Sequence, residues 1–101
     1  MEFVLDRYEK AVGPLFACQL SLQMFIEDTT NEYDNRKYAE TIYEWLGSIE
    51  CTIDELCNMS YEKSIFILNV LKKYKITNDS NLIINYGDAI DSLEWQVILM
   101  N

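Results

Sequence analysis

The chain has 101 residues, of which half are hydrophobic and 13% aromatic, as is typical of one folded domain. Seventeen acidic residues against eight basic ones give a formal net charge of −9, which repels nucleic acid backbones and anionic membranes and attracts basic proteins. We therefore expect a single acidic domain over residues 1–101 that binds neither nucleic acid directly nor a membrane.

Cellular location is indicated by apolar runs and cysteines. The longest nearly apolar run, 65–71, contains Asn69 and is far shorter than the roughly 20 residues that cross a bilayer. Five charged residues lie among the first twelve, unlike a signal peptide. The three cysteines are odd in number, which suits a reducing compartment. We expect a cytoplasmic protein.

Catalytic motifs are absent from the sequence. There is no histidine, so the common nucleophile–base pairs and zinc sites lack their usual side chains. Gly13, Gly47 and Gly87 are too scattered for a phosphate-binding loop. Two carboxylates could still act as in a glycosidase or hold magnesium, but with 17 acids some meet by chance. We predict no enzymatic activity, no cofactor and no metal.

The first predicted helical segment is an apolar stripe from Val4 to Ile26 at the 100° step of a helix. Pro14 either kinks one helix or starts a second. Residues 15–26 are apolar nearly all round, so we predict that they form the central buried helix. The polar residues 27–32 predict a loop.

An amphipathic helix is predicted next, ending near Gly47. Its apolar face contains Tyr38, Ile42, Trp45, Leu46 and Ile49. Charged residues lie on the opposite face, among them Glu40 and Glu44. We therefore expect Tyr38 in the core.

Two helix starts are marked by capping residues. Thr52 and Glu55 match a capping box, which predicts a short helix to about Cys57. Ser60 is a predicted N-cap for a longer helix over 61–74, which has lysines near its negative end.

The C-terminal quarter is less clear. Residues 78–81 read as a turn, and either a short strand near 82–86 or a helical turn fits the run that follows. From Asp88 onward, apolar spacing predicts a final amphipathic helix, with a terminal strand over 95–100 as the alternative. The fold class we expect is an all-α bundle of four to five helices.

The outward face of that last helix is the first candidate binding site. It carries Asp88, Asp91 and Trp95, opposite the apolar stripe. Tryptophan is enriched at interface hot spots, and flanking carboxylates can pair with Arg or Lys. In the alternative, another helix covers Trp95 and the acids only solvate its rim. We predict that all three residues bind a partner.

A second candidate site lies in residues 38–62, which contain six acids and no base. The predicted partner-binding residues there are Tyr43, Glu44, Glu50, Asp54 and Glu55. Glu44 has no cation nearby in the sequence, and Tyr43 lies on the flank of the helix. The alternative is a solvated acidic face that serves solubility.

These features predict a binding protein with a basic partner. Our leading hypothesis is an immunity protein that inhibits a nuclease toxin, since charge complementarity speeds association and selects partners. One alternative is a viral anti-defence protein or DNA mimic whose carboxylates imitate phosphates. Another is a structural or adaptor subunit that uses an apolar helical face. The sequence sets no oligomeric state.

Overall fold

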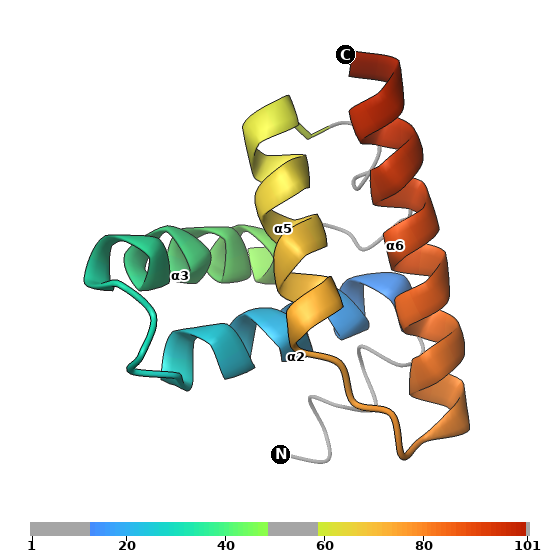
Figure 1. The fold of residues 1–101 in the computed structure, drawn as a ribbon, viewed down its shortest axis with the longest axis horizontal. Helices are drawn as coiled ribbons and strands as arrows, with labels where there is room; N and C mark the ends of the chain where they lie inside the picture. The colour runs from blue at the N-terminus through green and yellow to red at the C-terminus, as the bar shows by residue number, and fades with distance from the viewer. Residues whose placement is uncertain (1–12, 49–58, 101) are drawn as a thin grey trace.

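The computed structural model describes residues 13–48 and 59–100 of the chain. The elements in these residues are the α-helices α2 (Gly13–Glu27), α3 (Tyr33–Ser48), α5 (Tyr61–Lys73) and α6 (Ser80–Met100). One hairpin is formed by α2 and α3, and a second by α5 and α6 crosses it (Figure 1). The all-α prediction is confirmed for the described part of the chain.

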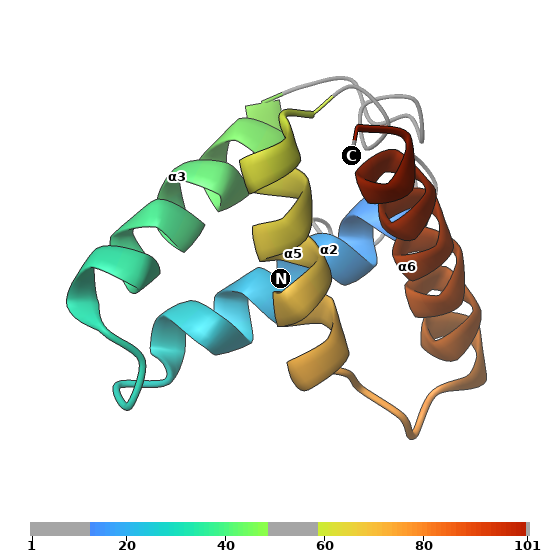
Figure 2. The ribbon, with the colours of Figure 1, turned by 45° about the horizontal axis from the view of Figure 1, so that its top comes forward.

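The central helix is α2, as predicted. It packs against α3, α5 and α6, and Figure 2 shows α5 crossing it between α3 and α6. Five consecutive residues, 15–19, are buried, which requires cover on every side of a helix. The largest fully buried apolar side chains are Leu15, Leu22, Ile42, Leu46, Ile67, Leu71 and Leu93. They come from all four helices, so one core joins both hairpins.

Aromatic rings fill the space where α2, α3 and α5 meet. The Phe66 ring lies edge-on to Phe25 at 5.4 Å and to Tyr38 at 4.8 Å between centroids. Tyr38 is nevertheless 37% exposed, so its predicted place in the core is wrong. The reason is that Tyr38 precedes Ala39, the first buried residue of α3, so the core covers less of the helix at this point.

The α2–α3 loop is tied to the end of α5 by polar side chains. The Asp28 carboxylate accepts from the Thr30 amide at 3.0 Å and from the Thr30 hydroxyl at 2.6 Å. It also accepts from the Tyr74 hydroxyl at 2.5 Å. Asn31 Nδ2 donates to the Phe25 carbonyl and to Tyr74 Oη. The predicted loop is confirmed, although Glu27 still belongs to α2.

Helix α5 begins as its capping residue predicts. Ser60 Oγ accepts from the Lys63 amide at 3.3 Å, and the helix runs from Tyr61 to Lys73. The end is marked by Tyr74, whose amide still donates to the Val70 carbonyl. The predicted helix over 61–74 is thus confirmed. The predicted short helix near 52–57 and the question of how Pro14 joins residues 1–12 lie outside the described residues.

Helix α6 is longer than the sequence indicates. Asp79 Oδ1 accepts from the amides of Asn81 and Leu82 at 2.9 and 3.1 Å, which makes Asp79 its N-cap. The strand alternatives at 82–86 and 95–100 are wrong, because both segments lie inside one helix. Its buried stripe of Tyr86, Ala89 and Leu93 continues past Gly87 at helical spacing. Gly87 therefore lowers helix stability without ending the helix.

Candidate protein-binding site

The outer face of α6 exposes apolar and acidic side chains together. Trp95 is 65% exposed and Leu99 77% exposed. We call the exposed residues Ile84, Asp88, Asp91, Trp95, Ile98 and Leu99 the outer face of α6. At 100° per residue these six positions fall within about 100° of arc, which places them on one side of the helix. The structure thus brings Asp88, Asp91 and Trp95 together; their role in binding stays a prediction.

The rotation of α6 about its axis follows from its inner stripe. Leu93 and Ala89 have no exposed surface, and Tyr86 is also buried, against α2 and α5. Because this stripe is buried, the residues on the opposite side of α6 face the solvent. Trp95 lies on the side of α6 opposite this buried stripe, and it is therefore exposed.

A pocket opens beside Trp95, between α5 and α6. Its volume is about 370 Å³, and it is lined by Leu68, Asp91, Glu94, Trp95, Val97 and Ile98. Leu68 is only 7% exposed and Val97 is half-buried, so the base of the pocket is apolar. Asp91 and Glu94 supply the polar part of the rim. This combination of an apolar base and a few polar groups is typical of a binding pocket.

The acids of this surface differ in their local partners. Glu94 Oε2 lies 3.3 Å from Lys72 Nζ, so a cation of the neighbouring α5 compensates this carboxylate. Asp88 and Asp91 have no Lys or Arg nitrogen within 4 Å among residues 13–48 and 59–100. The last basic residue of the chain is Lys75. The outer face of α6 therefore has a negative potential that a cation from outside can reduce.

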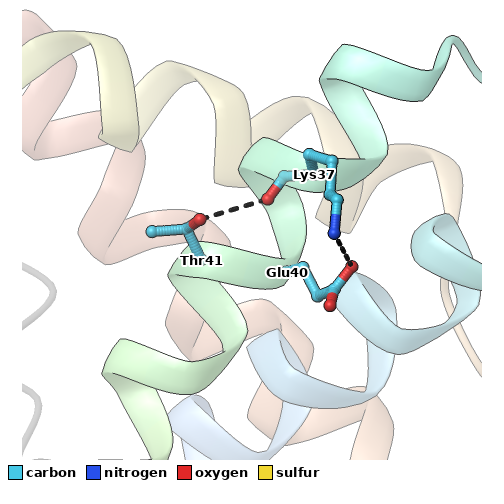
Figure 3. Close-up of polar contacts among 3 residues, drawn as sticks. All are labelled: Lys37, Glu40 and Thr41. Carbon is cyan, nitrogen blue, oxygen red and sulfur yellow. Dashed lines mark hydrogen bonds and ion pairs between the residues drawn. The ribbon is translucent and has the colours of Figure 1, made fainter.

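The α3 candidates have a different setting. Tyr43 is half-buried against the core, and its carbonyl accepts from Gln19 Nε2 at 3.4 Å. Glu44 is exposed, while Glu40 one turn earlier lies 4.0 Å from Lys37 Nζ (Figure 3). In the same figure, Thr41 Oγ1 donates to the Lys37 carbonyl at 3.2 Å. This surface mixes acids with cations.

The described candidates of α3 and those of α6 do not form one surface. Figure 2 shows α5 lying between α3 and α6, with Tyr43 and Glu44 on α3 and the other group on α6. Glu50, Asp54 and Glu55 lie outside the described residues. Of the predicted site residues, only those of α6 are thus shown to share a face.

Sequence reasoning missed part of the α6 surface. Ile98 lies three residues after Trp95, so the helical phase that selected Asp88 and Asp91 could also have found it. Leu68 belongs to α5 and forms part of the pocket only because α5 packs against α6. No sequence signal near Leu68 indicates that contact.

A second pocket and a buried thiol are the other two features that bear on chemistry. An open pocket of about 600 Å³ lies between the starts of α2 and α6, and Asp79, the one carboxylate among its described lining residues, already caps α6. Burial raises the pKa of the Cys18 thiol to about 12, which keeps it protonated and unreactive at neutral pH. Within the described ranges, no three His, Cys, Asp or Glu side chains gather as metal ligands. Neither feature indicates a catalytic site.

Comparison of the chain with protein-family models, with curated protein sequences and with solved structures found no match. None of the helices in the described residues combines the length and the apolar character needed to span a membrane. The outer face of α6 and the net charge of −9 are therefore the features that bear on function.

Proposed function

We propose that the protein is an acidic inhibitor that binds and neutralises a basic nucleic-acid-acting protein, such as a nuclease toxin, as an immunity protein does. The observation that carries the proposal is Trp95, 65% exposed, on one face with Asp88 and Asp91. A rigid aromatic ring buries a large area at low entropic cost, and carboxylates pair with Arg and Lys. We place this interaction in the cytoplasm and assign the protein no catalytic role.

Charge supports a basic partner. An enzyme that acts on nucleic acid neutralises phosphates with Lys and Arg, so its binding surface is positive. A chain of net charge −9 is attracted to such a surface, and the attraction increases the association rate. An inhibitor seated there excludes the nucleic acid substrate directly.

The test is a pulldown from the native host with two baits, the wild-type protein and Trp95→Ala. We expect the wild-type bait to recover a basic, nucleic-acid-acting protein and the variant to recover much less of it. Both baits are first compared by circular dichroism, so that loss of binding is not loss of fold. Recovery of only acidic or neutral proteins without nucleic-acid activity would refute the proposal.

The identity of a recovered basic protein separates two versions of the inhibitor. A toxin encoded beside this chain supports an immunity protein. A host defence protein with a DNA-binding surface supports an anti-defence role. For a DNA mimic we expect acids in phosphate-like rows, whereas the outer face of α6 places Trp95 and Leu99 among its acids.

A structural or adaptor subunit is the second candidate, because Ile98 and Leu99 are exposed apolar side chains. Salt distinguishes it from the inhibitor. Association through apolar contacts persists at high ionic strength, while a complex steered by charge weakens as the Debye length shortens. Measuring the affinity of the recovered complex at low and high salt therefore decides between the two candidates.

A further inference from the structure

We infer that the pocket between α5 and α6 accepts a basic amphipathic helix of the partner. One apolar side chain of this helix enters beside Trp95, and cationic side chains lie over Asp91 and Asp88. The inference rests on the proposed function and names the chemistry of the contact.

The shape of the pocket favours an inserted side chain. Its volume of about 370 Å³ is near the lower end of the roughly 300–1,000 Å³ of ligand pockets. Leu68 and Val97 form an apolar base, with Trp95 and Ile98 beside them. The Lys72–Glu94 ion pair borders the pocket and occupies one of its two lining carboxylates. Asp91 remains as the acid that an incoming cation can reach.

The spacing along α6 suits a helix laid beside it. Asp91 and Asp88 precede Trp95 by four and seven residues, or about 6 and 10 Å along the axis at 1.5 Å per residue. A partner helix presents side chains at the same intervals when they are four and seven residues apart. An apolar anchor with Arg or Lys at those two spacings therefore meets Trp95, Asp91 and Asp88 together.

Charge argues against a second copy of this chain as the occupant. Symmetric pairing of two outer faces would bring the Asp88 and Asp91 pairs of two chains, each with net charge −9, to the same interface. Like charges at an interface oppose association. A basic helix instead gains attraction from the same acids.

The probes are three synthetic, fluorescently labelled peptides. The first is an amphipathic helix with a central Leu and Arg four and seven residues away on both sides, so that it can bind in either direction. The second has the same composition, with each Arg moved two residues to the opposite face. The third replaces Arg with Glu. Binding is measured by fluorescence anisotropy at low and high salt, and the contacted residues by NMR shift changes.

Variants of the protein localise the contact. We expect Trp95→Ala to weaken binding of the first peptide at least about tenfold, as removal of a hot spot does. The double variant Asp88→Asn/Asp91→Asn should lower the affinity for the first peptide severalfold at low salt and reduce the salt dependence of that affinity. Exposed controls are Ile83→Ala on another side of α6 and the charge-matched Glu27→Gln/Glu32→Gln near the α2–α3 loop. These should stay within about twofold.

The inference is supported if the first peptide binds at least about tenfold more tightly than the second, with shift changes centred on α6 and Leu68. It is overturned if no peptide binds, if the second or third binds as tightly as the first, or if the changes lie elsewhere. Dimerisation in sedimentation runs that Trp95→Ala abolishes would assign the surface to a second copy. A basic partner recovered from the host, together with a negative peptide result, would leave the proposed function standing without this contact.

Discussion

Helices α2 and α6 are both rich in apolar residues, yet their neighbours cover them to different extents. The middle of α2 is buried on every side, because α3, α5 and α6 all pack against it. Helix α6 is covered by α2 and α5 on one side only, and Trp95, Ile98 and Leu99 remain exposed on the other. The apolar side chains of α2 therefore stabilise the fold, whereas only those on the inner side of α6 do so.

The difference has an energetic meaning. Full burial of a large apolar side chain contributes about 1.5–3 kcal/mol. The side chains of α2 have already released this free energy in folding. Those on the outer face of α6 have not, so it remains available to a partner that covers them. An exposed apolar cluster beside acids is thus better explained by association than by folding.

Leucine substitutions test this contrast most strongly. We expect Leu22→Ala in α2 to lower the free energy of unfolding by about 2–5 kcal/mol, because it leaves a cavity in the core. Leu99→Ala on α6 should change it by no more than about 0.5 kcal/mol, since the side chain is exposed. Urea denaturation followed by circular dichroism measures both. A Leu99 effect as large as that of Leu22 would mean that the outer face contributes to the fold.

Substitution of two buried serines should have the next largest effect on the free energy of unfolding. Ser21 of α2 donates to the Tyr74 carbonyl and shares a hydrogen bond with the Tyr86 hydroxyl, 3.1 Å away on α6. Ser64 of α5 is equally buried, but its hydroxyl has no hydrogen-bond partner among residues 13–48 and 59–100. We expect Ser21→Ala to cost about 1–3 kcal/mol, because it leaves buried polar groups unpaired. Ser64→Ala should be neutral or slightly stabilising in the same urea experiment. Equal costs would contradict this account of α2.

The end of α2 should contribute stability that depends on pH. Hydrogen bonds from Thr30 and Tyr74 lower the pKa of Asp28 to about 2, below the roughly 3.9 of an unfolded chain. A lowered folded pKa adds stability that is present above about pH 4 and is lost as the pH falls toward 2. We expect the urea midpoints of wild type and Asp28→Asn to approach each other between pH 5 and pH 2.

Tyr74→Phe is the companion variant for that titration. It removes one hydrogen bond to Asp28 and should raise the carboxyl pKa, so its stability should fall at a higher pH than that of the wild type. The control is Asp91→Asn, on the outer face of α6. A wild-type to Asp28→Asn difference that does not change with pH would show that the carboxylate adds no ionisation-linked stability.

The fold was predictable where local signals agreed with packing. Helix α5 has Ser60 as its N-cap and lysines at its C-terminal end, and it was predicted nearly residue for residue. Helix α6 is only partly predictable, because Asp79 falls in a predicted turn and Gly87 interrupts the helical pattern. Its inner stripe is decided by contacts with α2 and α5, which no local window contains.

The candidate site was predictable to a similar degree. The helical phase placed Asp88, Asp91 and Trp95 on one face, and the structure has them there. Whether a helix covers that face depends on tertiary packing, so exposure of Trp95 could not be derived from phase alone. The same limit explains Tyr38, whose phase is that of the core but which precedes Ala39, the first buried residue of α3.

The two tryptophans provide the mildest test of the comparison, with little change in stability. Trp95 is exposed near Asp88 and Asp91, whereas Trp45 is half-buried and Lys63 Nζ lies 4.2 Å from its ring centroid. Trp45→Phe and Trp95→Phe each leave one tryptophan, which can be excited selectively over the seven tyrosines. Acrylamide is neutral, so its quenching reports exposure alone. We expect it to quench Trp95 more strongly than Trp45, because Trp95 is the more exposed ring.

Charged quenchers then report the potential around each ring. Carboxylates concentrate cations and repel anions, so caesium relative to iodide should be more effective at Trp95 than at Trp45, by roughly twofold at low salt. High salt should remove the difference, and Asp88→Asn/Asp91→Asn in the Trp45→Phe background should reduce it. Equal caesium-to-iodide ratios at both tryptophans would show that the acids of α6 create no useful field at Trp95. The charge argument for a basic partner at this face would then fail, and its apolar residues alone would remain to explain binding.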